Sequence, residues 1–200
     1  MKRLLLARHA QAVSNVDDVV SSTPPGRGLS AVVLEQAQAL RRSLADVPID
    51  SGFSSRLLRA QETLEHALAP RQTPLEVLPE LYEIDFGAFD GGPLPAYRAW
   101  AWSTGPDAAP PGDGESRVAL ALRVAHSLEL LLERPEPVIL AVGHALPLRY
   151  ALDGIEGSTP QARMRPVPHA TAFSFGAAEV GRGVAALRAW AAAPHFADAA

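Results

Sequence analysis

The hydrophobic and polar positions alternate between short apolar runs and longer amphipathic segments. Residues 4–7 form a continuous apolar run, which is typical of a strand buried on both faces. Similar runs predict further strands at residues 49–53, 138–142, 170–175 and 184–190. Because helical patterns separate most of these runs, we predict one α/β domain: a three-layer α/β/α sandwich with a mainly parallel central sheet.

Three segments show helical spacing most clearly. The second of them contains Arg59, and the third covers residues 115–133. Pro147 suits the first turn of a further helix after the 138–142 strand. The first segment begins after Ser30, which we expect to cap it, and its apolar positions are Val33, Leu34, Ala37, Leu40 and Leu44.

The length and composition restrict the class of protein. At 200 residues and 48% hydrophobic, the chain suits one domain over residues 1–190, and residues 191–200 read as a frayed C-terminal tail. The net charge of -4 argues against a nucleic-acid partner. No cysteine is present, which excludes disulfides and thiolate metal sites. No apolar stretch is long enough for a signal peptide or a membrane span, so we expect no membrane partner and a cytoplasmic location.

Two of the predicted strands end in a histidine. Arg8 and His9 follow the first strand, and His144 follows the strand at residues 138–142. Open α/β sheets bind ligands at the carboxyl ends of their strands, and neighbouring strands lie about 5 Å apart. Two imidazoles could therefore meet at one phosphate, where a neutral imidazole can attack and a guanidinium can hold the oxygens. Alternatively, Arg8 and His9 are merely two polar residues that end a strand.

Two further residues have a catalytic and a structural interpretation. Arg59 would add a second cation to a phosphate site, or it is a solvated residue on the face of its helix. Glu83 lies in a loop where a carboxyl group could act as general acid, and Asp85 is a nearby rival for that role. Tyr97, Trp100 and Trp102 suit a core or a cap over the pocket better than a nucleic-acid stacking surface.

Several segments, in the order in which they occur, resemble the histidine phosphatase superfamily, also called the phosphoglycerate mutase-like family. The resemblance extends over about residues 2–175. Each motif alone is weak, but a chance match of all of them in order is improbable. The matching segments are residues 8–15 (the Arg-His signature), 29–37, 54–63 (with the second arginine), 81–87 (the acid loop), 111–116 and 142–144 (the second histidine).

This resemblance implies a metal-independent phosphomonoesterase that acts on small phosphorylated metabolites through a phosphohistidine intermediate. No metal and no other cofactor is implied, because two arginines and two imidazoles supply the charge that a magnesium ion supplies elsewhere. The implied roles are His9 as nucleophile, Glu83 as acid, Arg8, Arg59 and His144 as the phosphate pocket, Asn15 as a further donor, and Ala145 as a neighbour of the bound phosphate.

The chain departs from the family's usual residues at four places. Ala10 and Ala145 stand where glycine is usual, Ala12 replaces a threonine, and Asp90 replaces a glutamate. A methyl group at the first two positions would narrow the approach of the backbone to the phosphate. We expect these changes to alter the tightness of the pocket and the substrate range, without removing a core catalytic group.

Two other functions remain open: an isomerase of the mutase type, and a phosphate-binding pseudoenzyme. We expect hydrolysis to dominate, because the candidate lid at residues 103–114 has no Lys or Arg to hold a second anionic group. A homodimer is possible. His169 reads as structural rather than catalytic. The candidates for contact with the non-phosphate part of the substrate are Arg27, Arg56, Arg98 and Arg117, of which the last two flank the lid.

Overall fold

A central sheet organises the computed structural model, which describes residues 1–30 and 34–197. In the described part of the chain the sheet has five strands in the order β3-β2-β4-β1-β5. All neighbours pair in parallel except β5, which is antiparallel to β1. The predicted, mainly parallel sheet is therefore confirmed. Its strands are β1 (Arg3–Arg8), β2 (Ser51–Ser54), β3 (Leu75–Val77), β4 (Val138–Gly143) and β5 (Ala172–Gly176).

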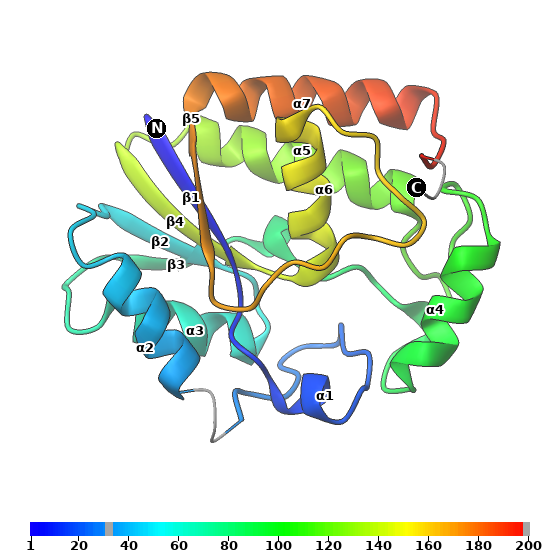
Figure 1. Ribbon diagram of the computed structural model, residues 1–200, viewed down its shortest axis with the longest axis horizontal. Helices are drawn as coiled ribbons and strands as arrows, with labels where there is room; N and C mark the ends of the chain where they lie inside the picture. The colour runs from blue at the N-terminus through cyan, green and yellow to red at the C-terminus, as the bar shows by residue number, and fades with distance from the viewer. Residues whose placement is uncertain (31–33, 198–200) are drawn as a thin grey trace.

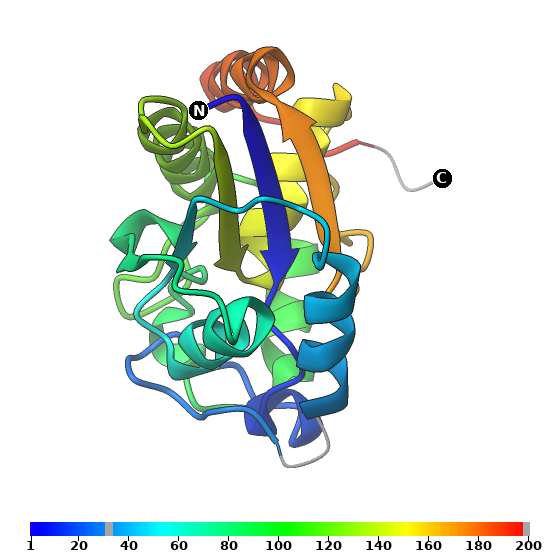
Figure 2. The same ribbon diagram turned by 90° about the vertical axis from the view of Figure 1, so that its left-hand side faces the viewer.

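Helices cover both faces of this sheet (Figures 1 and 2). Successive residues of β1 point to opposite faces, so Leu4 and Leu6 join one core and Leu5 and Ala7 the other. The first core packs against α5 (Arg117–Leu132), α6 (Ala145–Glu156) and α7 (Ala177–Ala192), and the second against α2 (Leu34–Ser43) and α3 (Leu58–Leu68). This arrangement confirms the predicted α/β/α sandwich.

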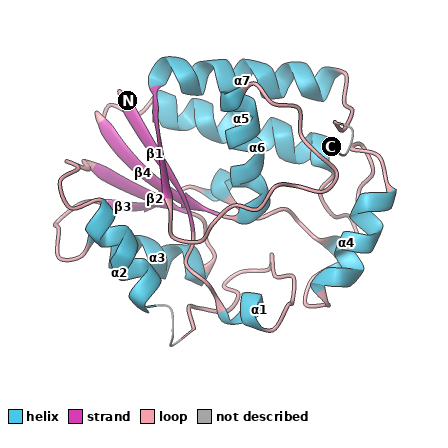
Figure 3. Cartoon of the chain, in the orientation of Figure 1, coloured by secondary structure: helices cyan, strands magenta, loops and turns pink. Residues whose placement is uncertain are grey.

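Two shorter helices lie beyond the carboxyl ends of the strands (Figure 3). They are α1 (Val13–Val16) and α4 (Leu94–Ser103), and 3-10 turns at Pro79–Leu81 and Gly87–Phe89 separate β3 from α4. The helix predicted at residues 115–133 is α5, whose first turn is capped by the Ser116 hydroxyl, which accepts from the Ala119 N–H at 3.1 Å. Pro147 lies in the first turn of α6, as predicted.

The strand predicted at residues 184–190 is wrong, because this segment is the second half of α7. Its buried residues are Val180, Gly183, Val184, Leu187 and Trp190, at the three- and four-residue intervals of a helix face. The alanines between them have high helix propensity, which outweighs the short apolar run that suggested a strand. The edge strand β3 was not predicted, since all three of its residues are exposed and carry no burial pattern.

The described part of the chain end, up to residue 197, makes specific contacts with the domain. Helix α7 continues to Ala192, and beyond it the Trp190 indole donates to the His195 carbonyl at 2.7 Å. The Ala197 N–H then donates to the Pro160 carbonyl at 3.0 Å. Ser30 was predicted to cap a helix that begins directly after it. The first residues of that helix would be 31–33, which lie outside the described residues. No helix within the described ranges is both long and apolar enough to cross a membrane.

Candidate active site

The two predicted histidines meet at the carboxyl edge of the sheet. Strands β1 and β4 are direct neighbours, and their register pairs Arg8 with Gly143. His9 and His144, the next residues of the two segments, therefore lie side by side with ring centroids 5.1 Å apart. This separation confirms the prediction that the two strands are adjacent and that the two imidazoles lie at neighbouring strand ends.

The hydrogen bonds of His9 determine which of its nitrogens is free to react. Nδ1 lies 2.7 Å from the Ala10 carbonyl oxygen, which can only accept, so Nδ1 carries the hydrogen. Nε2 accepts from Arg59 Nε at 3.2 Å and therefore carries the lone pair. Burial, with the nearby Arg59 and Arg8 charges, holds the pKa of His9 well below its usual value. The ring is thus neutral at pH 7, with a nucleophilic Nε2.

His144 is held from behind by a serine of the neighbouring strand end. Its Nε2 lies 2.7 Å from the hydroxyl of Ser55, and both side chains are fully buried. Burial, followed by the charge of Arg59, also holds the pKa of His144 well below its usual value. Its Nδ1 is buried without a hydrogen-bond partner among the described residues. If the Ser55 hydroxyl donates to Nε2, Nδ1 carries the hydrogen and can donate to an anion.

The two predicted arginines each donate to a backbone carbonyl and each keep a buried nitrogen without a partner among the described residues. Arg8 Nη1 donates to the Val167 carbonyl at 2.8 Å, and Arg59 Nη2 donates to the Ser21 carbonyl at 2.8 Å. Arg8 Nε and Arg59 Nη1 are buried and lack a partner in the described ranges. Burial lowers the pKa of Arg8 to about 10, with Glu83 acting in the opposite direction, so the group stays charged at pH 7.

Of the two candidate acids, Glu83 belongs to the site and Asp85 does not line it. Glu83 is 7% exposed, and its Oε1 accepts from the Ile84 N–H at 3.0 Å. Burial raises its pKa, although Arg59 and Arg8 partly offset this effect. Asp85 is exposed and accepts from the Gly87 N–H at 2.8 Å, which makes it part of the turn.

The loop that carries Glu83 is fixed by an arginine from α5. Arg123 Nη1 donates to the carbonyls of Glu80 and Tyr82 at 2.8 and 2.9 Å, and its Nη2 reaches the Glu83 carbonyl at 3.4 Å. The same guanidinium pairs with Glu115 at 2.6 Å. Since three carbonyl contacts within residues 80–83 leave the loop little freedom, Arg123 sets the position of the candidate acid.

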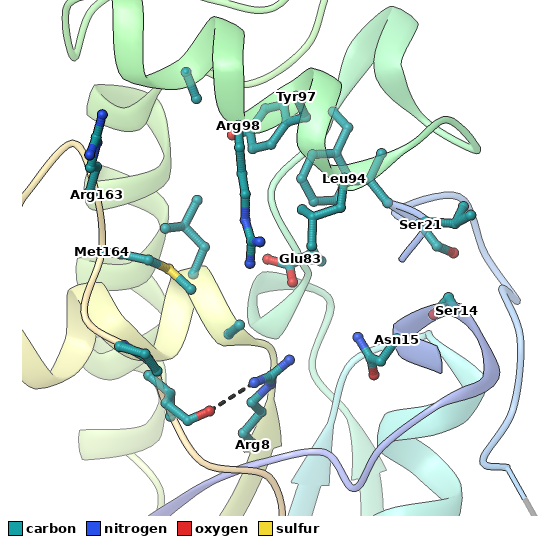
Figure 4. A pocket seen from close by; sticks show the side chains of 18 of the residues that line it. Arg8, Ser14, Asn15, Ser21, Glu83, Leu94, Tyr97, Arg98, Arg163 and Met164 are labelled. Carbon is teal, nitrogen blue, oxygen red and sulfur yellow. Dashed lines mark hydrogen bonds between the residues drawn. The ribbon is translucent and has the colours of Figure 1, made fainter. Parts of the chain in front are cut away.

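The candidate catalytic side chains lie at one end of a cavity of about 260 Å³ (Figure 4). Arg8, His9, Arg59 and Glu83 line this end, whereas His144 lies behind His9 and is fully buried. The far end is lined mostly by apolar residues, together with three further arginines. The remaining lining includes Leu94, Tyr97, Ala101 and Trp102 of α4, Arg98, Arg117, Leu146, and the loop residues Arg163, Met164, Pro166 and Val167.

Asn15 and Ala145, the two remaining residues predicted to bind the substrate, also line the cavity. Asn15 uses its Oδ1 to accept from the Ala12 N–H at 2.9 Å, which leaves its amide nitrogen to face the cavity (Figure 4). Ala145 is the first residue of α6, where backbone N–H groups have no partner within the helix. Both can thus donate toward an anion held beside His9.

The departures from the family pattern have identifiable places. Ala10 is fully buried in an apolar cluster with Ala37 and does not line the cavity, so its methyl group leaves the phosphate end unobstructed. Its N–H donates to the Thr63 hydroxyl at 2.9 Å. Ala12 is also fully buried. Asp90 accepts hydrogen bonds from Ser22 and Thr23, and thereby fixes the turn that follows Ser21.

Only two of the four arginines proposed for the non-phosphate part of the substrate line the cavity. These are Arg98 and Arg117; Arg27 instead pairs with Asp17, and Arg56 is exposed elsewhere. The loop at residues 103–114 does not line the cavity, so its expected role as a lid is wrong. Physically, it packs against the acid loop, where the Ala88 N–H donates to the Pro111 carbonyl.

Three contributions to the site were not predictable from the sequence. Ser55 is one of two adjacent serines, and nothing in the pattern distinguishes the one that meets His144. Arg123 occupies an ordinary helix position. The loop at residues 158–171 closes one side of the cavity and contacts the site through His169, whose Nδ1 lies 2.8 Å from the His9 carbonyl. Its polar composition is typical of any loop.

The described residues contain no group of three or more His, Cys, Asp or Glu side chains placed to hold a metal ion. The phosphate end offers donors instead: Arg8 Nε, Arg59 Nη1 and His144 Nδ1, all buried and without a partner in the described ranges. Leaving buried donors unsatisfied is costly, so such a cluster suits an anion. Whether the activity is independent of metals stays a prediction.

Comparisons with known proteins agree with this geometry. The family model described as "Histidine phosphatase superfamily (branch 1)" matches residues 4–192. An adenosylcobalamin/alpha-ribazole phosphatase of Escherichia coli is 35% identical over 71% of this chain and 73% of its own. A 2,3-bisphosphoglycerate-dependent phosphoglycerate mutase of Brucella melitensis is 30% identical over 80% of this chain and 84% of its own. The crystal structure of the alpha-ribazole phosphatase from Shigella flexneri superposes with a TM-score of 0.73, at 31% identity, over 86% of this chain and 89% of that one. The chain therefore belongs to the histidine phosphatase superfamily, branch 1, as the resemblance predicted, and it is an enzyme of the phosphatase class.

Proposed function

We propose that this protein hydrolyses small phosphomonoesters through a phosphohistidine intermediate on His9. The supporting observation is the state of His9 Nε2, a lone pair on a buried neutral ring, surrounded by donors that lack partners. A dianionic phosphate placed there would accept from Arg8, Arg59 and His144. It would also draw the Arg59 guanidinium away from Nε2 and free the lone pair for attack.

The first step forms a bond between Nε2 and phosphorus and breaks the bond from phosphorus to the ester oxygen. The departing oxygen takes the proton of Glu83, whose pKa is raised by burial, which favours the protonated carboxyl group. The alcohol then leaves. In the second step the Glu83 carboxylate removes a proton from water, the water oxygen bonds to phosphorus, and the phosphorus–nitrogen bond breaks. Inorganic phosphate leaves, and both side chains regain their starting states.

The substrate is proposed only by class. The alpha-ribazole phosphatases among the relatives suggest a small phosphorylated metabolite. The cavity adds room for an apolar part of the substrate, because side chains such as Leu94, Ala101 and Met164 line it away from His9. A volume of about 260 Å³ suits a metabolite rather than a macromolecule.

Rapid quenching tests the proposal directly. The protein is mixed with a panel of ³²P-labelled phosphomonoesters in the presence of EDTA, and the quenched sample is examined for protein-bound label. We expect phosphate release that EDTA does not change, and a protein adduct that is labile in acid and stable in base. Phosphate release without such an adduct, or activity that EDTA abolishes and magnesium restores, would contradict this mechanism.

A mutase remains a second candidate because Arg98 and Arg117 line the cavity. A mutase must hold a second anionic group while the phosphoryl group returns to the substrate, and these side chains supply the charge that the loop at residues 103–114 lacks. Incubation with 3-phosphoglycerate separates the two functions. Formation of 2-phosphoglycerate faster than inorganic phosphate would favour the mutase.

The cytoplasmic location and the homodimer stay predictions. Cell fractionation can test the first, and analytical sedimentation can test the second.

A further inference from the structure

The cavity contains more positive charge than one phosphate group can neutralise. Five arginines line it, and the lining carboxylate among the described residues is Glu83 alone. A bound phosphate dianion would offset Arg8 and Arg59 at the catalytic end. The far end keeps three arginines: Arg98 of α4, Arg117 of α5 and Arg163 of the 158–171 loop.

Arg117 is the least usual of these three, because it is buried without a counterion. It is 7% exposed, and its Nη1 is buried with no hydrogen-bond partner in the described ranges. The nearby Glu115 pairs instead with Arg123 at 2.6 Å. A buried charge without a partner is strongly unfavourable, so a position like this one suits an anion that arrives with the ligand.

The surroundings of Arg117 do not supply that anion. The hydroxyls of Tyr97 and Tyr150 lie close enough for the guanidinium to affect their titration, and both are buried without a partner in the described ranges. Burial raises the pKa of Tyr150 to about 12, with Arg117 acting in the opposite direction. Burial likewise raises the pKa of Tyr97. Both groups are therefore neutral at pH 7 and leave the charge of Arg117 uncompensated.

Arg98 lines the same cavity as Arg117 but comes from a different helix. Its side chain extends from α4 into the cavity, and its guanidinium points toward Glu83 and Arg8 (Figure 4). Its charge contributes to lowering the pKa of Arg8, which places it within electrostatic range of the phosphate end. Arg163 differs, because its guanidinium stacks 4.7 Å from the Trp102 ring centroid and points away from Arg8.

We propose that Arg98 and Arg117 form a second anion subsite, so that the preferred substrates are phosphomonoesters that carry a second anionic group on a short apolar spacer. The spacer would lie against the apolar wall, which includes Leu94, Ala101 and Leu146. The second anion, a carboxylate or a further phosphoryl group, would accept from both guanidinium groups. This inference deepens the proposed function and rests on the same cavity.

The test uses non-hydrolysable phosphonates, so that binding is measured without turnover. Calorimetry compares 3- and 4-carboxyphenyl phosphonate with the 3- and 4-carbamoylphenyl phosphonates, which have nearly the same shape and keep the phosphonate charge but lack the carboxylate. A phenylene bisphosphonate shows whether a phosphoryl group serves better than a carboxylate. The variants are R98Q and R117Q, and R182Q is the matched control, because Arg182 is exposed on α7 and does not line the cavity.

We expect at least one carboxyphenyl phosphonate to bind about ten- to a hundredfold more tightly than its carbamoyl counterpart, as for a hydrogen-bonded charge. R98Q and R117Q should each reduce that ratio about tenfold or more, whereas R182Q should retain it. Equal affinity for the carboxyphenyl and carbamoylphenyl phosphonates, or tighter binding of the carbamoylphenyl phosphonates, would overturn the subsite. Since Arg98 is exposed, R98Q keeps the test decisive even if R117Q fails to fold.

Turnover of the corresponding aryl phosphates separates this proposal from the proposed function. Selective binding of the charged phosphonates with no release of phosphate from any ester would leave the subsite standing and contradict the phosphatase mechanism. Release of phosphate from the carboxyphenyl and carbamoylphenyl phosphates with equal kcat/KM, together with equal affinities for the corresponding phosphonates, would leave the phosphatase mechanism standing. It would contradict the subsite.

Discussion

The two ends of the cavity are built in different ways. At the phosphate end the side chains come from strand ends and the first turns of helices, are buried, and are oriented by backbone groups: His9 by Ala10, Arg8 by Val167, Arg59 by Ser21. At the far end they come from α4, from the start of α5 and from the 158–171 loop, and although Arg117 is buried, Arg98 and Trp102 are exposed. The comparison teaches that strand ends position most of the phosphate-binding side chains, whereas helices and a loop beyond the sheet form the part of the cavity that would contact the rest of the substrate.

The largest effect should follow the loss of the nucleophile. His9→Ala removes the lone pair that forms the covalent intermediate, so we expect turnover to fall by roughly 10⁴-fold or more, as for other nucleophiles. His126→Ala is the control, because that histidine is exposed on α5. Phosphate release and circular dichroism are measured together. Near-normal turnover in a folded His9→Ala protein would exclude His9 as the nucleophile.

Replacing the acid should distinguish substrates by their leaving groups. Glu83→Gln keeps the shape but cannot give up a proton, so alkyl phosphates should lose about a hundredfold to ten-thousandfold in kcat. Nitrophenyl phosphate should lose much less, since its leaving oxygen needs little protonation. Asp85→Asn is the matched control on the same loop. Equal losses on both substrates would place the acid role elsewhere.

The pH profile should show the opposite pKa shifts of two groups. His9 must be neutral to attack, and its lowered pKa keeps it neutral well below pH 6.5. Glu83 must be protonated, and its raised pKa extends that form toward neutral pH. We therefore expect an optimum on the acid side of neutrality, with kcat for alkyl phosphates falling about tenfold per pH unit above the pKa of Glu83. Glu83→Gln should remove this alkaline limb; a limb that persists would come from another group.

A smaller effect is expected from the serine behind His144. Ser55→Ala removes the 2.7 Å contact that orients the imidazole, and we expect kcat to fall about tenfold, as for one lost hydrogen bond, with little change in KM. Ser54→Ala is the control, because Ser54 is also buried but makes no such contact with His144. A rise in KM with kcat unchanged would show that Ser55 does not act through His144.

The smallest effect should come from the far end. Trp102→Ala removes the ring on which Arg163 stacks, and we expect KM to rise about threefold, the usual size of a partly exposed cation–π contact. Leu122→Ala, an exposed position on α5, is the control. Steady-state kinetics would measure both parameters. A loss in kcat larger than the rise in KM would show that the two ends are not as separate as their construction suggests.

The main fold and the chemical residues could be predicted from the sequence, because both leave local patterns. A strand buried on both faces must be apolar throughout, so β1 and β4 were recognisable, and the polar residues that follow them mark the edge of the sheet. The edge strand β3 leaves no such pattern, and the apolar run in α7 has two interpretations when its partners are unknown.

The sequence by itself identified the candidate catalytic residues: His9, Arg8, Arg59, His144 and Glu83 stand in recognisable segments in a recognisable order. Only the tertiary structure decided how they work together. The tautomer of His9, the contact of Ser55 with His144 and the choice of Glu83 over Asp85 depend on groups far apart in the chain. So does the exclusion of the 103–114 loop from the cavity. Burial and long-range hydrogen bonds arise from packing, and no local pattern of residues encodes them.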